Sequence, residues 1–254
     1  MSTRSFGTVL TALLMTSGSA FADQFYFVGP SPGVAWERVY VNPYAADENT
    51  PPQNNPLTIY CDDWDTELSG NPKWNANTYA LARADLTNFK FGQVTTTQSV
   101  SLFGGRLQYS TISVHAYDLY LEAVYLDQRV QISGSGITPL QQEELSAAEW
   151  TLFTSSGGAI LLGDINNSGT AFASAVYNDL VAAQNAVAND QVNAAGWDVI
   201  TPADNSVAMQ EFLLDDFHGT VNGLSQVPEP GAVVLLGTVV GFLGWAKFRR
   251  GRQP

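Results

Sequence analysis

The sequence predicts an α+β fold, a β-barrel or β-sandwich with a helical insertion of about three helices, followed by one C-terminal transmembrane helix. Two observations on the order of segments predict it. Short segments rich in Val, Ile, Tyr and Trp stand at both ends of 24–214, and longer segments of helical period lie between them. A third observation, a long uncharged apolar run near the C-terminus, predicts the membrane helix.

The predicted strands lie where β-branched and aromatic residues gather. The segment 42–56 is polar and holds four prolines, so we predict a loop there. Gly104 and Gly105 supply the positive-φ positions of a hairpin turn between 93–102 and 106–112. The remaining predicted strands are 24–28, 34–41, 57–60, 197–201 and 207–214.

Helical period marks three segments, 115–130, 140–154 and 170–189. Pro139 suits the first position of the second helix, because its missing N–H has no partner there in any helix. We predict a loop at 157–169. Its stretch from Asp164 to Gly169 resembles half a calcium loop, but Ala175 stands where a bidentate Glu is required. We therefore expect a turn, with Ser168 or Thr170 capping the third helix.

Charge excludes one class of function. The whole chain has a formal net charge of −13, but the region 23–228 holds six Lys and Arg against 23 Asp and Glu, a net of −17. Such a surface repels nucleic acid, so we expect no nucleic-acid partner. Cys61 is the only cysteine, so an exported chain of this sequence builds no internal disulfide.

The N-terminus has the anatomy of a secretory signal peptide. Arg4 gives a positive start, 6–15 is mostly apolar, and Ala20 and Ala22 are small residues at −3 and −1 of a cleavage point. We expect the mature chain to begin at Asp23, outside the cytoplasm.

The C-terminal segment 231–246 has 16 residues without a charge. A full span requires about 20 apolar residues, so the segment is short, and snorkelling cations extend it. Trp245 lies at the expected interface. A cationic cluster follows and predicts a cytoplasmic end by the positive-inside rule. Its members are Lys247, Arg249, Arg250 and Arg252.

Val227, Pro228, Glu229 and Pro230 precede this span, and the tail as a whole resembles the PEP-CTERM sorting signal of Gram-negative bacterial surface proteins. The resemblance implies recognition by an exosortase, a membrane protease-transpeptidase, and delivery to the outer surface or the extracellular (biofilm) matrix. The two prolines favour an extended segment that an enzyme can grip.

The predicted organisation has four parts. They are a signal peptide (1–22), an extracellular α+β domain (23–218), a linker (219–226) and the sorting signal (227–254).

Two further segments resemble the thioester-forming domains of bacterial surface adhesins, over roughly 25–155. The aromatic-Cys-acid run at Tyr60-Cys61-Asp62 and the helix ending at Trp150 carry the resemblance. It implies a bond between the sulfur of Cys61 and a Gln side chain. Ser146 occupies the Gln position, and Gln141 and Gln142 lie a turn or more upstream, so we expect Cys61 to be a small buried hydrophobe. A Cys61–Gln142 thioester is the alternative.

Other polar groups have weaker patterns. The carboxylates at Asp62, Asp63, Asp65 and Glu67 offer oxygen ligands for a hard cation, but an acidic solvated loop is the commoner meaning. His115 and His218 have no nucleophile motif near them, and we expect both to be structural or exposed.

These observations favour a non-enzymatic, exported surface or matrix protein, structural or adhesive, without a cofactor. Its expected partners are signal peptidase, the exosortase, the membrane before processing, and exopolysaccharide or matrix. The alternatives are a covalent adhesin acting through Cys61 and an extracellular polysaccharide hydrolase with two convergent carboxylates.

Overall fold

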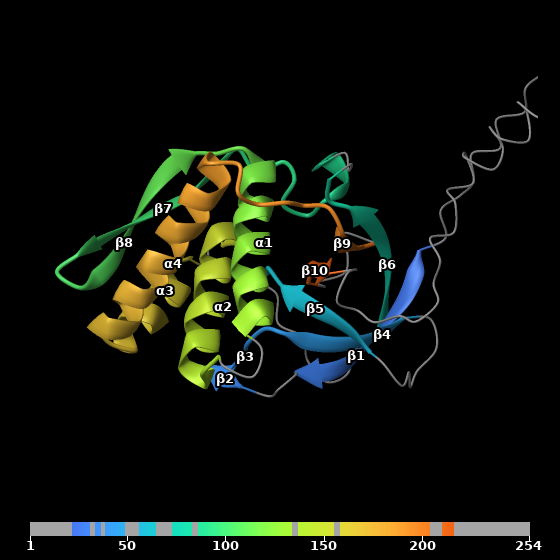
Figure 1. Ribbon diagram of the computed structural model, residues 1–254, viewed down its shortest axis with the longest axis horizontal. Helices are drawn as coiled ribbons and strands as arrows, with labels where there is room; N and C mark the ends of the chain where they lie inside the picture. The colour runs from blue at the N-terminus through green and yellow to red at the C-terminus, as the bar shows by residue number, and fades with distance from the viewer. Residues whose placement is uncertain are drawn as a thin grey trace, which may run out of the picture. The chain divides into compact units, whose positions relative to one another are not determined.

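The computed structural model describes residues 22–30, 34–36, 39–48, 56–64, 73–82, 86–133, 137–154, 158–203 and 210–215. The fold is α+β, with a closed six-stranded antiparallel barrel and four helices in the described part of the chain. Figure 1 shows the helices gathered on one side of the barrel. Residues 1–21 of the predicted signal peptide, the sorting motif with its span and cations, His218, Asp65 and Glu67 lie outside the described residues.

The barrel combines strands from both ends of the domain. Residues near the start of the domain pair with residues near its end, as Cys61 does with Phe212. The helices are therefore an insertion between barrel strands. In barrel order the strands are β1 (Asp23–Pro30), β4 (Tyr44–Glu48), β5 (Leu57–Cys61), β10 (Phe212–Asp215), β9 (Trp197–Pro202) and β6 (Lys73–Ala80), which returns to β1.

Alternation along the strands separates two cores, because neighbouring side chains on a strand point to opposite faces. On β5, Ile59 and Cys61 join the cluster that fills the barrel, with Trp74 and Phe212. Tyr60 faces outward and packs in the larger cluster between barrel and helices.

The helices are α1 (Ala116–Ser133), α2 (Pro139–Phe153), α3 (Gly158–Asn167) and α4 (Thr170–Ala188). Pro139 opens α2 as predicted, after a capping box in which Thr138 and Gln141 satisfy each other's backbone groups. Aromatic rings join the helices to the rest of the core. Trp36 stacks on Phe172 of α4 at a centroid distance of 5.2 Å and on Trp150 of α2 at 6.4 Å.

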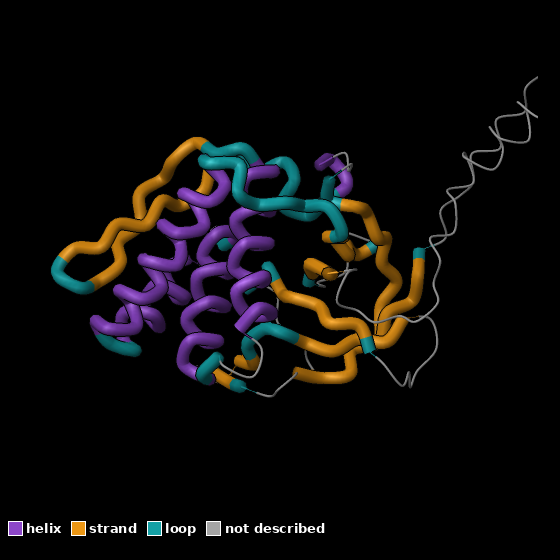
Figure 2. Tube along the Cα trace, in the orientation of Figure 1, coloured by secondary structure: helices purple, strands orange, loops and turns teal. Residues whose placement is uncertain are grey.

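The predicted hairpin is confirmed. Strands β7 (Thr96–Phe103) and β8 (Arg106–Ser113) pair in antiparallel register around Gly104 and Gly105, whose φ values are +59° and +75°. Figure 2 shows this hairpin extending beside the helices, apart from the barrel.

Several element predictions were wrong. The predicted loop 42–56 contains β4, and 34–41 is two short strands, β2 (Ala35–Trp36) and β3 (Val39–Tyr40), paired with each other. Strand β6 was missed. The predicted loop 157–169 is mostly α3, so the described part of the insertion has four α-helices. Neither Ser168 nor Thr170 caps α4: Gly169 is the N-cap residue and makes no side-chain bond.

Within the described ranges, no helix combines the length and the apolar character that crossing a membrane requires. The predicted C-terminal helix lies outside those ranges.

Candidate functional site

Asn42, which is fully buried, ties the barrel to the helices. It lies just before β4, and its side chain pairs with the backbone at the end of β5. The Cys61 N–H donates to Asn42 Oδ1 at 2.7 Å, and Asn42 Nδ2 donates to the Cys61 carbonyl at 3.2 Å. Trp150 Nε1, on α2, donates to the same carbonyl at 2.9 Å. The strand end is therefore fixed from two directions.

One face of α2 supplies the remaining partners of Asn42. Gln142 and Ser146 are four residues apart, so they share a face of the helix, and Glu149 follows them. Gln142 Nε2 donates to the Asn42 carbonyl at 2.5 Å, and the Asn42 N–H donates to Ser146 Oγ at 3.1 Å. Asn42 Nδ2 also donates to Glu149 Oε2 at 2.5 Å. Every polar group of Asn42 thus has a partner, as a buried amide requires.

The thiol of Cys61 faces the barrel interior and is buried. It donates to the Asp63 carbonyl at 3.5 Å. Burial raises the pKa of the thiol, and the carboxyls of Asp63 and Asp62 raise it further. Because the thiolate is the nucleophilic form, burial and the raised pKa both disfavour a reactive thiol at this position. The interpretation of Cys61 as a small buried hydrophobe agrees with these contacts.

Acidic side chains gather beyond the end of β5. Asp62 and Asp63 are both buried, and Lys90 forms an ion pair with Asp63. Glu211, also buried, accepts the Lys90 backbone N–H at 2.7 Å and the Tyr120 hydroxyl at 2.5 Å. Burial raises the pKa of Asp62, and so do Glu211 and Asp63 beside it. Burial also raises the pKa of Glu211, whereas the hydrogen bonds from Tyr120 and Lys90 act to lower it.

A second pair of carboxyls meets where α1 packs on α2. Burial raises the pKa of both Asp127 and Glu149, and the two groups lie within hydrogen-bonding reach of each other. Two ionised carboxylates have no donor between them, so hydrogen bonding between Glu149 and Asp127 requires a proton on at least one of the two carboxyls.

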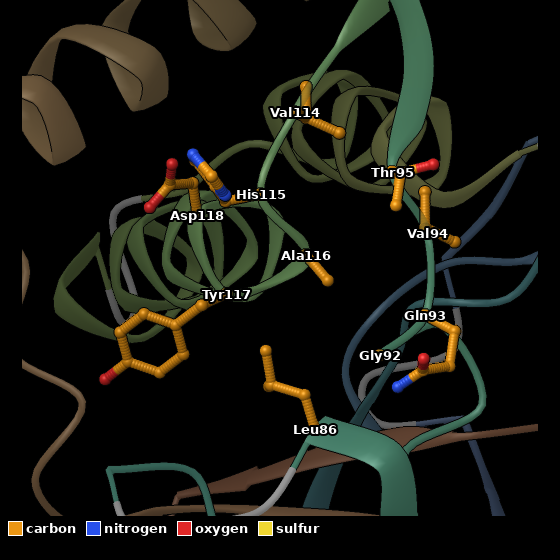
Figure 3. A pocket seen from close by; sticks show the side chains of 10 residues that line it. All are labelled: Leu86, Gly92, Gln93, Val94, Thr95, Val114, His115, Ala116, Tyr117 and Asp118. Carbon is orange, nitrogen blue, oxygen red and sulfur yellow. The ribbon is translucent and has the colours of Figure 1, made fainter.

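A pocket of about 470 Å³ lies away from these clusters, between the start of α1 and the segment 86–95. Figure 3 shows His115 and Asp118 near one another on one wall, with Gln93 and Thr95 on the other. Its lining has one imidazole and one carboxylate, Asp118. Among the described residues, no group of three or more His, Cys, Asp or Glu side chains is placed to hold a metal ion.

The structure brings together Cys61, Gln142, Ser146 and Trp150, all through contacts with Asn42 or with the Cys61 backbone. It separates Gln141 from them, because that side chain is exposed and bonded to Thr138.

The segment from Asp164 to Gly169, which resembles half a calcium loop in sequence, is largely helical. Asp164 and Asn166 lie on α3, and the Asn166 side chain pairs with the Leu107 backbone instead, at 2.7 and 3.1 Å.

Sequence reasoning missed Asn42, Lys90, Asp127, Glu149 and Glu211. The two carboxylates on helices did leave a signal in the sequence. Glu149 stands among Ala147, Ala148 and Trp150, and Asp127 lies at helical spacing from the apolar residues Ala123, Val124 and Val130. Asn42 lies in the predicted loop 42–56, Lys90 lies outside every predicted element, and Glu211 lies in the predicted strand 207–214, so no local pattern distinguishes them.

Comparison with known proteins identifies no related protein or structure. No protein-family model matches the chain, and searches of curated proteins and of solved structures give no significant match. The two resemblances stated above rest on the quoted residues alone.

Proposed function

We propose that this chain is the precursor of an exported, non-enzymatic protein of the cell surface or extracellular matrix, sorted by an exosortase through its C-terminal signal. One observation carries the proposal: Val-Pro-Glu-Pro at 227–230, an uncharged apolar run, and a cationic cluster occur in that order. The signal-peptide anatomy of 1–22 supports it, because export would place the acidic body outside and leave the cations inside.

The body suits a role in display or adhesion. Its net charge of −17 over 23–228 favours solubility, and its one thiol is buried, so it offers no reactive cysteine to an oxidising compartment. Cohesion between barrel and helices comes from the buried contacts of Asn42 and from packed aromatic rings. An exported scaffold without disulfides requires such internal contacts.

Sorting is tested by producing the full chain in a Gram-negative host with and without an exosortase. With the enzyme, C-terminal peptides from surface material should end near Pro230; without it, they should extend to Pro254. Glu229→Ala should abolish the cut, whereas Glu143→Ala, a change on α2, should leave it intact. Intact tails in the host that has the enzyme would contradict the proposal.

A second candidate, covalent adhesion through a Cys61–Gln142 thioester, is favoured by one observation. Both residues are buried, and the Cys61 backbone N–H and the Gln142 side chain both bond to Asn42, although the thiol itself faces the barrel interior. Thioester formation joins the sulfur to the Gln142 carbonyl carbon with loss of ammonia. Intact-mass measurement should then show a deficit of one ammonia that disappears in Cys61→Ala and on treatment with methylamine. Full mass in the untreated wild type would eliminate this candidate.

Polysaccharide hydrolysis has no such observation in its favour. Glycoside hydrolysis usually requires a pair of carboxylates on either side of the scissile bond. The lining of the described pocket contributes only Asp118, and the buried carboxyls beyond β5 are closed to a polymer.

A further inference from the structure

Lys90 and Asp63 form an ion pair that connects the segment after the short 3-10 helix η1 (Leu86–Asn88) to the end of β5. The Asp63 side chain is 1% exposed and the Lys90 side chain 32%. Each backbone is fixed separately: Gln210 Nε2 donates to the Asp63 carbonyl at 3.0 Å, and the Lys90 N–H donates to Glu211 at 2.7 Å. The fold therefore holds the two backbones close together independently of the attraction between the amine and the carboxyl.

An aromatic ring covers the amine. Lys90 Nζ lies 5.5 Å from the ring centroid of Phe91, and that ring packs on Phe153 of α2 at 5.0 Å. Since Phe153 is a core residue, Phe91 is fixed in turn. The ring limits the water that reaches the Lys90–Asp63 contact from that side.

Asp62 is a buried carboxyl that makes no hydrogen bond in the described fold. It is fully buried beside the pair, and neither of its oxygens has a hydrogen-bond partner there. Burial and the neighbouring carboxyls raise its pKa, which favours the protonated acid. Lys90 and Asp63 act on this carboxyl electrostatically without a hydrogen bond to it, so Asp62 passes a proton from the amine to the Asp63 carboxyl only after a side-chain movement brings them together.

We propose that Lys90 and Asp63 condense into an intramolecular amide bond, an isopeptide cross-link. Lys90 Nζ attacks the side-chain carbonyl carbon of Asp63, a C–N bond forms, and one C–O bond breaks with loss of water. The ion pair already contains all the atoms. The ammonium loses two protons, and both depart on the leaving oxygen, with Asp62 carrying them across. No oxidant, reductant or cofactor enters the balance.

Fixed geometry makes the step reasonable at ordinary temperature. Well-oriented intramolecular reactants have effective concentrations on the order of 10⁵ M or more. The product would close the chain between 63 and 90, and a covalent closure stabilises a fold by restricting the unfolded chain. It would serve a protein whose single thiol excludes an internal disulfide. The inference depends on this contact and not on the proposed export.

Peptide mapping of the full chain tests it. Trypsin cuts after Lys and Arg, so an unlinked chain yields the separate peptides 39–73, with Asp63, and 84–90, ending at Lys90. A linked chain is not cut after Lys90 and yields 39–73 joined to 84–106, with a mass one water below the sum of the linear peptides 39–73 and 84–106. We expect the branched peptide to dominate. Recovery of linear 39–73 and of 84–90 as the main products would overturn the proposal.

Variants separate the amide from an ion pair and from a thioester. Lys90→Arg keeps the charge but cannot condense, so full mass is expected, whereas Lys73→Arg on the exposed side of β6 should still lose water. Asp62→Asn should slow the appearance of the branched peptide after synthesis; an unchanged time course would remove Asp62 from the step. A mass deficit that Cys61→Ala or methylamine abolishes would mean that the bond is a thioester and not this amide.

Discussion

Asn42 pairs with Cys61 as one strand pairs with another. The Asn42 side-chain amide accepts the Cys61 N–H at 2.7 Å and donates to the Cys61 carbonyl at 3.2 Å, so it substitutes for a neighbouring strand at the end of β5. Because the same amide also donates to Glu149 on α2, one residue satisfies groups of both the barrel and the helical insertion.

Removing the Asn42 side chain should therefore destabilise the domain. In Asn42→Ala the Cys61 N–H and the Glu149 carboxyl lose their partners while buried, at a cost of roughly 2–5 kcal/mol. Urea unfolding measures the loss. Asn178→Ala, an exposed position on α4, is the matched control and should stay within about 0.5 kcal/mol of the wild type. Equal effects at the two positions would contradict the role given to Asn42.

The elements that the sequence predicted well have long or unambiguous local patterns. Helices α1, α2 and α4 repeat apolar residues over several turns, and the hairpin has Gly104 and Gly105 where positive φ is required. The strands that it missed are weak locally: β4 reads Tyr-Ala-Ala-Asp-Glu, and β6 buries only Trp74 and Ala76 among polar neighbours. These strands form because they pair with neighbouring strands in a closed barrel, and that pairing cannot be predicted from local sequence patterns.

Helix α3 and the buried polar site escaped prediction for a related reason. Leu161 and Ile165 of α3 are buried in the main cluster, which stabilises a Gly- and Asn-rich segment as a helix against its local preference. The site depends on distant partners: Asn42 and Ser146 are 104 positions apart. The resemblance already paired Cys61 with the helix ending at Trp150, as thioester partners, whereas the role of Asn42 in joining them follows only from the fold.

The contact between the Glu149 and Asp127 carboxyls predicts that Glu149 can be replaced by glutamine with little loss of stability. A glutamine has the shape of a neutral glutamic acid, and its carbonyl can accept from Asn42 while its NH₂ donates to Asp127. Glu149→Gln should therefore change the free energy of unfolding at neutral pH by less than about 1 kcal/mol. Glu149→Met, of similar length, should cost roughly 3 kcal/mol because Asp127 loses its donor. A Gln variant as damaged as the Met variant would mean that Glu149 is ionised.

Glu122 on α1 should make stability depend on pH. Burial, with the nearby carboxyl of Asp118, raises its pKa from 4.5 to about 8. The folded state therefore holds the proton more tightly, so this contribution is complete below about pH 4.5 and is lost as pH rises through about 8. Between these limits the slope is about 1.4 kcal/mol per pH unit. Urea titrations at several pH values should give a flatter profile for Glu122→Gln, and parallel profiles would contradict the assignment.

Two glycines should respond in opposite directions to the same change. A Cβ on Gly92 would stand 1.6 Å from the backbone oxygen of Leu86, whereas one on Gly163, inside α3, meets nothing within 4 Å. Backbone cannot move aside as a side-chain end can, so Gly92→Ala should cost about 3 kcal/mol or more. Gly163→Ala should stabilise by roughly 0.5–1 kcal/mol, because alanine loses less conformational freedom in a helix. Thermal and urea unfolding of the two variants measure both effects, and a tolerated Gly92→Ala would show that the segment from Leu86 to Gly92 packs less closely than described.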